Sequence, residues 1–181
     1  MDILILGGTE FVGRHITNHA IQKGHNVSLL NRCNNTDIFP QLKRHCVDRN
    51  DTLDIKLDID CIIDISGYYR YQVKNILDNI STRYYIFISS VAVDWDDDMM
   101  YDYKHGKIGC EIEIINKVKK SLIFRPTYIC GKYDNTNRFD YSKWPDVYWI
   151  GTNDKVNYVN VSQFSYNVID NMERGIEGII Y

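Results

Sequence analysis

Short continuous apolar runs alternate along this chain with longer segments whose apolar residues recur at helical spacing. A continuous run is typical of a strand buried on both faces of a parallel sheet, and a spacing of three to four residues is typical of an amphipathic helix. The runs predict strands at residues 3–6, 26–30, 44–47, 61–65, 84–88, 122–124, 156–159 and 178–181. The helical spacing predicts helices at residues 11–23, 72–80, 106–118 and 163–173. This alternation predicts an α/β fold, with a doubly wound parallel sheet in a single domain.

A glycine-rich turn, GGTEFVGR at residues 7–14, joins the first predicted strand to the first predicted helix. Glycines let the backbone turn tightly, so that the N-terminus of the helix faces an anion such as the pyrophosphate of a dinucleotide. The usual fingerprint has three spaced glycines, whereas here Gly7 and Gly13 occupy the outer places and Glu10 the middle one. We interpret the segment as the pyrophosphate turn of a Rossmann-type fold. The alternative is the ordinary strand-turn-helix start of another α/β protein.

A second group of residues carries candidate acid-base chemistry. Tyr103 and Lys107 are four residues apart, which places them on one face of a helix. An ammonium group beside a phenol stabilises the phenolate and lowers its pKa, so that Tyr103 can act as general acid and base. Ser90 follows the strand at 84–88 and can hold a substrate oxygen. The alternative interpretation is that this segment is only the exposed start of a helix. A chain with 14 tyrosines and 21 basic residues contains Tyr-x-x-x-Lys pairs by chance.

Composition narrows the possible partners. The 181 residues suffice for one domain with a substantial core, and a net charge of −3 gives no electrostatic reason to expect nucleic acid or an anionic membrane. Asp2 stands where a signal peptide would carry basic residues, and no apolar run is long enough to span a bilayer. We therefore expect a cytoplasmic protein with a small-molecule substrate and with no nucleic-acid or membrane partner.

The cysteines and histidines suggest no metal site. The five cysteines are scattered and never spaced as CxxC, so we expect reduced thiols and neither a disulfide framework nor a zinc site. They are Cys33, Cys46, Cys61, Cys110 and Cys130. His15 and His19 lie one turn apart on the first predicted helix, but no third ligand accompanies them.

Taken in order, these segments resemble the extended short-chain dehydrogenase/reductase family, and within it the NAD-dependent epimerase/dehydratase branch. The resemblance covers nearly the whole chain. It is carried by GGTEFVGR at 7–14, NR at 31–32, VDR at 47–49, DISGY at 64–68, YYIFISSVAV at 84–93, YKHGK at 103–107, FRPTYICGKYD at 124–134 and VNYVNVSQF at 156–164.

The resemblance implies an NAD(P) cofactor, a Ser-Tyr-Lys triad and, most often, a nucleotide-sugar substrate. Ser90, Tyr103 and Lys107 match the triad. The matched cofactor residues are Gly7, Gly8, Thr9, Phe11, Val12 and Gly13 at the pyrophosphate, Asp48 at the adenine edge, Gly67 beside the adenosine, and Pro126 and Tyr128 beside the nicotinamide. In 4,6-dehydratases the triad hydroxyl is followed by Asp-Glu, whereas Val91 and Ala92 follow it here, so the resemblance does not extend to that activity.

The end of the second predicted strand bears on the choice of cofactor. NAD-specific members of such folds usually have a carboxylate there for the ribose hydroxyls, but this chain has Asn31 followed by Arg32. A cation favours a 2′-phosphate, so the sequence predicts NADP(H) in preference to NAD(H). Glu10 argues against this choice, since it adds a like charge near the phosphates. The alternative interpretation of Arg32 is a loop cation with no ligand.

Two departures from the family leave two classes of function open. The connection from Ser90 to Tyr103 is shorter than the family norm, and the chain ends at Tyr181, where typical members continue into a C-terminal substrate-binding lobe. We expect a compact member with a reduced substrate-binding region around 133–155. One hypothesis is a reductase or epimerase; the other is a non-catalytic sensor or interaction protein that keeps the cofactor fold. By resemblance, a homodimer would form through the helices at 72–80 and 106–118.

Overall fold

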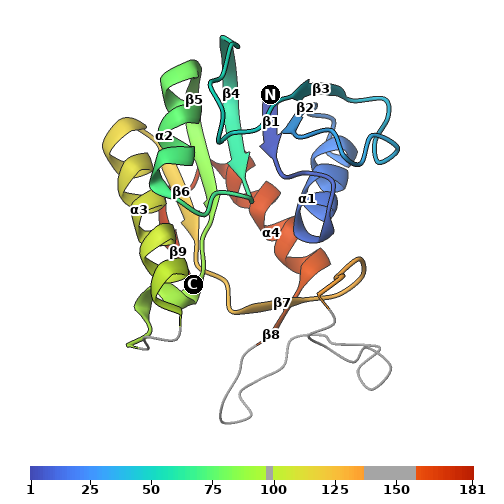
Figure 1. Cartoon of the computed structure of the whole chain (residues 1–181). Coiled ribbons are helices and arrows are strands. Elements are labelled where there is room, and N and C mark those ends of the chain that lie inside the picture. Colours follow the sequence, from blue (N-terminus) through green and yellow to red (C-terminus); the bar gives the residue numbers. More distant parts are fainter. Residues whose placement is uncertain (97–99, 137–157) are drawn as a thin grey trace.

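Seven parallel strands form one sheet within the residues that the computed structural model describes, which are 1–96, 100–136 and 158–181 (Figure 1). The order across the sheet is β3-β2-β1-β4-β5-β6-β9, and every neighbouring pair is parallel. The strands are β1 (Asp2–Leu6), β2 (Asn26–Asn31), β3 (Lys43–Cys46), β4 (Leu57–Asp64), β5 (Ile80–Ile88), β6 (Ser121–Phe124) and β9 (Gly178–Ile180). The order reverses between β1 and β4, as in doubly wound dinucleotide-binding folds, which confirms the predicted fold class.

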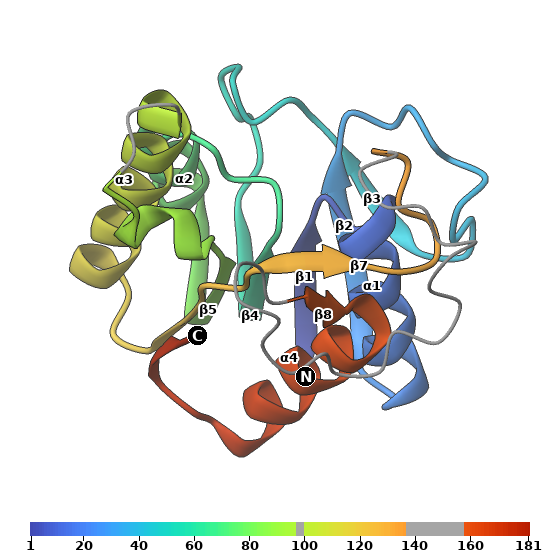
Figure 2. The same ribbon diagram turned by 90° about the horizontal axis from the view of Figure 1, so that it is seen from below.

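Helices cover both faces of this sheet. Figures 1 and 2 show α2 and α3 together on one face and α1 and α4 on the other. The helices are α1 (Phe11–Gln22), α2 (Arg70–Asn79), α3 (Tyr101–Lys117) and α4 (Val161–Arg174). Successive residues of β1 show how the two layers form, since Ile3 packs in the core of α1 and α4 while Leu4 packs in that of α2 and α3. Among the described residues, no helix is long and apolar enough to cross a membrane.

The β1–α1 turn needs glycine at both ends. Gly7 has φ +85°, a left-handed conformation that residues with a side chain seldom adopt. A Cβ on Gly13 would lie 1.9 Å from the main-chain oxygen of Gly7. The first turn of α1 therefore packs directly on the glycine turn, with no room for a side chain between them.

The structure corrects several predicted boundaries. Helix α3 begins at Tyr101, five residues before the predicted start, because the polar residues that open it show no apolar periodicity. Strand β5 begins at Ile80, the last residue of the predicted helix at 72–80. The sequence predicts no strand between residues 124 and 156, but this segment contains β7 (Tyr128–Cys130). Strand β7 pairs in parallel with β8 (Tyr158–Asn160) in a separate two-stranded sheet. The reduced substrate-binding region predicted around 133–155 lies mostly outside the described residues, because the description stops at 136 and resumes at 158.

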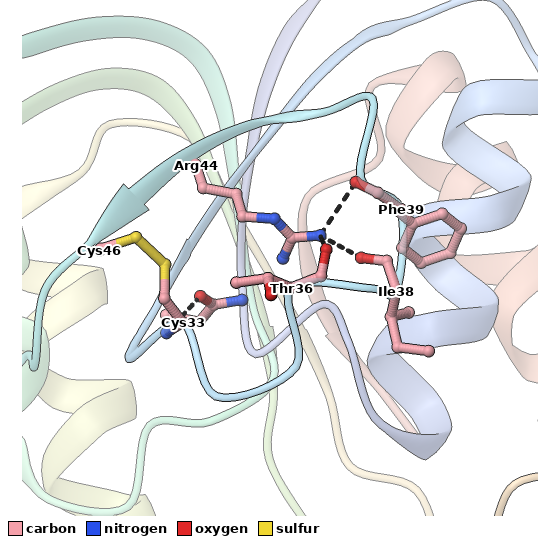
Figure 3. The surroundings of a disulfide bond; sticks show 7 residues. Cys33, Thr36, Ile38, Phe39, Arg44 and Cys46 are labelled. Carbon is pink, nitrogen blue, oxygen red and sulfur yellow. Dashed lines mark hydrogen bonds between the residues drawn. A yellow bond between two sulfur atoms is a disulfide. The ribbon is translucent and has the colours of Figure 1, made fainter.

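The expectation that all five cysteines are reduced is wrong. Cys33 and Cys46 form a disulfide, with their Cα atoms 5.3 Å apart (Figure 3). Parallel pairing of β2 with β3 places Asn31 opposite Cys46, so that Cys33, two residues farther along, comes within reach. Spacing in the sequence carries no sign of this tertiary pairing. The other three cysteines, Cys61, Cys110 and Cys130, are buried free thiols, as expected.

Candidate active site

A cleft of about 770 Å³ lies where β1, β2 and β5 end, and residues of β7 also line it. The carboxyl ends of the strands at the point where strand order reverses are where ligands bind in such sheets. The structure brings most of the predicted site residues to this one cleft. Those that line it are Gly7, Thr9, Phe11, Val12, Asn31, Arg32, Asp48, Ser90, Tyr103, Lys107, Pro126 and Tyr128.

Three predicted glycines lie behind the cleft rather than in its lining: Gly8, Gly13 and Gly67. A Cβ on Gly8 would lie 2.6 Å from the Thr17 hydroxyl, which donates to the main-chain oxygen of Gly8. A Cβ on Gly67 would lie 2.9 Å from a carboxylate oxygen of Asp64. These glycines therefore allow the backbone that carries the lining residues to pack closely on the sheet.

Lys107 is the one buried side chain among the three predicted catalytic residues, since Ser90 and Tyr103 are half-buried. Its side chain enters the cleft from α3 and is 3% exposed, and its Nζ donates a hydrogen bond to the main-chain oxygen of Ile88 at 2.9 Å. Burial lowers the pKa of Lys107 to about 8, although the negative charge of Asp64 acts in the opposite direction. The ammonium lies 4.7 Å from the centre of the Phe87 ring and 5.0 Å from that of Tyr68, distances suited to cation–π attraction.

Tyr103 lies one turn before Lys107 on the same face of α3 and is half-buried in the lining of the cleft. The Lys107 Nζ is 5.9 Å from the centre of the Tyr103 ring, and the Tyr68 ring is 6.0 Å from it. A Cβ on Gly106 would lie 2.2 Å from the main-chain oxygen of Tyr68, so α3 approaches that backbone closely. This close approach places the phenol and the ammonium against the same wall of the cleft.

Ser90 follows the end of β5 and begins a short 3₁₀ helix, η1 (Val91–Asp94). Its Oγ accepts a hydrogen bond from the main-chain N–H of Ala92 at 3.2 Å. A serine hydroxyl accepts and donates at once, so this contact leaves the hydroxyl hydrogen available to a ligand oxygen. The structure thus gathers Ser90, Tyr103 and Lys107 around one end of the cleft.

Sequence reasoning missed a buried ion pair beneath the cleft. The guanidinium of Arg49 donates two hydrogen bonds to the carboxylate of Asp64, at 2.8 and 2.7 Å, and the Tyr85 hydroxyl donates a third at 2.8 Å. Burial alone would raise the pKa of Asp64, but the charge of Arg49 and these hydrogen bonds lower it, so the carboxylate is ionised. A signal was present in the sequence, because an acid that ends an apolar strand needs a buried partner.

A second network supports the segment that carries Ser90. The hydroxyl of the preceding residue, Ser89, donates to Glu111 on α3, and Arg125 donates to both oxygens of the same carboxylate. Arg125 also pairs with Asp94 at 3.0 Å. These contacts fix the end of β5 against α3 and against the loop before β7.

The cleft has polar groups suited to a dinucleotide. In the described part of the chain, three buried polar atoms of lining residues have no hydrogen-bond partner: Asn31 Nδ2, Arg49 Nε and Thr127 Oγ1. Buried polar groups are nearly always paired in proteins, so such atoms indicate a place for ligand atoms. Arg32 is exposed at the rim of the cleft beside Asn31, and Asp48 accepts hydrogen bonds from the main-chain and side-chain nitrogens of Asn50. Residues at both ends of the cleft therefore fit NAD(P).

Glu10 lines the cleft and contacts the loop that follows β2. It is exposed, and its Oε1 accepts a hydrogen bond from the side-chain amide of Asn35 at 2.9 Å. The carboxylate in the middle place of the glycine fingerprint thus holds the loop that follows β2. Its charge is directed at a hydrogen-bond donor of that loop.

The two histidines of α1 have protein neighbours. The Nε2 of His15 lies 3.0 Å from the main-chain oxygen of Lys132, and burial lowers the pKa of both His15 and His19. Within residues 1–96, 100–136 and 158–181, no three His, Cys, Asp or Glu side chains are grouped as metal ligands would be.

No protein-family model and no curated protein matches the sequence. Solved structures do match. A UDP-N-acetylglucosamine 4-epimerase from Methanobrevibacter ruminantium M1, in complex with UDP-N-acetylmuramic acid, superposes with a TM-score of 0.73 at 17% identity, over 99% of this chain and 75% of that one. MoeE5 in complex with UDP-glucose and NAD gives 0.71 at 15% identity, over 99% and 74%.

A third match is a short-chain dehydrogenase/reductase of the wide type from Veillonella parvula DSM 2008, in complex with NADP. Its TM-score is 0.68 at 14% identity, over 97% of this chain and 88% of that one. The chain has the fold of these proteins. At such low identity the likeness establishes the architecture, while the chemistry has to be argued from this chain's own cleft.

Proposed function

We propose that the protein binds a nicotinamide dinucleotide and acts as an NAD(P)-dependent reductase or epimerase on a nucleotide-sugar-like or other carbonyl or hydroxyl substrate. The observation that carries this proposal is the single cleft that joins the glycine turn at one end to Ser90, Tyr103 and Lys107 at the other. The likeness to epimerases and to a dehydrogenase/reductase supports it.

Each member of the triad has a role that its surroundings favour. Tyr103 exchanges a proton with the substrate oxygen, and Ser90 donates its hydroxyl hydrogen to the same oxygen and orients it. Lys107, as a cation near the phenol, favours the phenolate and binds the ribose of the dinucleotide. When bound, the nicotinamide supplies or accepts the hydride.

Asn31, Arg32 and Asp48 would hold the adenosine end of the dinucleotide. Arg32 offers a cation for a 2′-phosphate, and Asn31 offers an unpaired amide hydrogen for a ribose or phosphate oxygen. NADP(H) is therefore the proposed cofactor.

A second candidate is a cofactor-binding sensor without turnover. Lys107 donates a hydrogen bond to Ile88 and Ser90 caps η1, so both of these triad side chains make hydrogen bonds within the protein. Such contacts would persist in a protein that binds the cofactor and performs no chemistry.

Cofactor titration followed by turnover tests the proposal. Trp95 lines the cleft, so NADPH should quench tryptophan fluorescence and raise the melting temperature, with a larger effect than NADH. If neither cofactor changes either signal, the proposal is wrong. Turnover of nucleotide-4-keto sugars should then fall at least about a hundredfold in Tyr103→Phe.

Tyr101→Phe is the matched control, because Tyr101 is exposed on the same helical turn and does not line the cleft. Equal turnover by wild type and Tyr103→Phe would remove Tyr103 from the mechanism. Cofactor binding without any turnover would favour the sensor.

A further inference from the structure

The Cys33–Cys46 disulfide lies at the base of the loop that joins β2 to β3, as Figure 3 shows. Both ends of this loop carry residues of the cofactor cleft. Asn31 and Arg32 precede Cys33, while Val47 and Asp48 follow Cys46, and all four line the cleft. The covalent bond therefore joins the two segments that would hold the adenosine end of the dinucleotide.

The loop has two further attachments. At its tip, the guanidinium of Arg44 donates to the main-chain oxygens of Ile38 and Phe39 (Figure 3). On its inner side, Asn35 donates to Glu10 beside the glycine turn. The tip is thus held to β3 independently of the disulfide. The disulfide holds the base of the loop, where Arg32, Asn34 and Asn35 line the cleft.

The backbone at this base is held in a disfavoured conformation. Cys33 has φ +58°, in the left-handed region that residues other than glycine seldom occupy. Its N–H donates to Asn31 Oδ1 at 2.9 Å, which orients the amide whose Nδ2 has no protein partner in the described chain. If the disulfide opened, Cys33 could leave this conformation. Asn31 and Arg32 would then no longer be held in their orientation toward the cleft.

Reagents can reach this disulfide selectively. Cys46 is exposed and Cys33 half-buried, whereas Cys61, Cys110 and Cys130 are buried. Burial also raises the pKa of each buried thiol, which suppresses the reactive thiolate. Thiol–disulfide exchange is therefore confined to the pair beside the cleft.

We propose that the Cys33–Cys46 pair is a redox switch of cofactor affinity, in which the disulfide form holds Arg32 and Asp48 in position for the adenosine end and the dithiol form releases them. The inference rests on the proposed function, because it concerns the same cofactor. Reduction by a small dithiol transfers two electrons and two protons to the pair, so that the S–S bond breaks, two thiols form and the reductant becomes a cyclic disulfide. Oxidation by a small disulfide reverses the change and releases two small thiols.

Calorimetric titration of the full chain with NADPH, before and after treatment with dithiothreitol, tests the switch. Alkylation and mass measurement should count three thiols in the oxidised protein and five in the reduced one. We expect NADPH to bind about tenfold more weakly after reduction, since the loop must then be ordered on binding. Reoxidation with glutathione disulfide should restore the affinity.

Variants separate the switch from general effects of the reagents. Cys33→Ser/Cys46→Ser should bind NADPH as the reduced wild type does and should not respond to dithiothreitol. Cys130→Ser, which alters a buried thiol, should keep the full response. Equal affinity of oxidised and reduced wild type would overturn the switch and leave the proposed function intact. If neither form binds NADPH or NADH, the proposed function itself fails.

Discussion

Lys107 directs its Nζ at the main-chain oxygen of Ile88, 2.9 Å away, and so points its charge at the carboxyl end of β5. The contact explains how an ammonium with almost no exposure is accommodated beside three aromatic rings. This hydrogen bond does not fully replace the water that would surround an exposed ammonium, so burial lowers the pKa of Lys107 to about 8.

The first prediction is that stability rises with pH through Lys107. An unfolded lysine has a pKa near 10.4, so between about pH 8 and pH 10 the unfolded chain binds a proton that the folded chain does not. The free energy of unfolding should therefore gain up to about 1.4 kcal/mol per pH unit in this window. Urea unfolding of wild type and Lys107→Met at pH 7, 8.5 and 9.5 measures this gain. Curves that stay parallel for the two proteins would contradict it.

The second prediction concerns the ion pair of Arg49 and Asp64. Removing one partner leaves a buried charge unpaired, so Arg49→Met and Asp64→Asn should each lower the free energy of unfolding by about 3–5 kcal/mol. The double variant Arg49→Met/Asp64→Asn should be less destabilised than the two single effects added together. Urea unfolding of all four proteins gives the coupling energy, and strict additivity would show that the two groups act independently.

The third prediction concerns cofactor preference. Arg32→Glu should weaken NADPH binding by roughly tenfold to a hundredfold, because a charge-assisted contact with the 2′-phosphate is lost, and should leave NADH nearly unchanged. Calorimetric titration of both cofactors measures the change in preference. Arg174→Gln, on an exposed side chain of α4 outside the cleft, is the control. If both cofactors weaken equally, Arg32 does not contact the 2′-phosphate.

The fourth prediction compares two glycines of the first βαβ unit. Gly13→Ala places a methyl group against the Gly7 carbonyl and should cost at least about 3 kcal/mol of stability, with loss of NADPH binding. Gly24→Ala meets no atom within 4 Å and should cost only about 1 kcal/mol, for its φ of +80°. Thermal unfolding ranks the two variants. A mild effect at Gly13 would mean that α1 can move away from the turn.

Most of the fold could be predicted because the strands of a doubly covered parallel sheet are continuous apolar runs. Tyr84 to Ile88 show this clearly, since all five are buried. The gathering of the candidate site residues at one cleft could be predicted for a related reason: the carboxyl ends of such strands converge, which brings Asn31 and Ser90 to the same cleft. The disulfide and the buried ion pair could not be predicted, because both depend on which segments lie side by side in the folded chain. The disulfide requires the pairing of β2 with β3, and the partner of Asp64 is 15 residues away in the sequence.

The parallel pairing of β1 has a consequence for the order of folding. In the sheet, Leu4 lies between its register partners Ser28 of β2 and Ile62 of β4, and Leu4 and Ile62 belong to the same core layer. During synthesis the first strand leaves the ribosome well before β4 exists, so it cannot complete its place in the sheet at once. Contacts between such distant segments form slowly, because a long chain must close before they are made. The glycine turn, which directly follows β1, is therefore expected to reach its final form late.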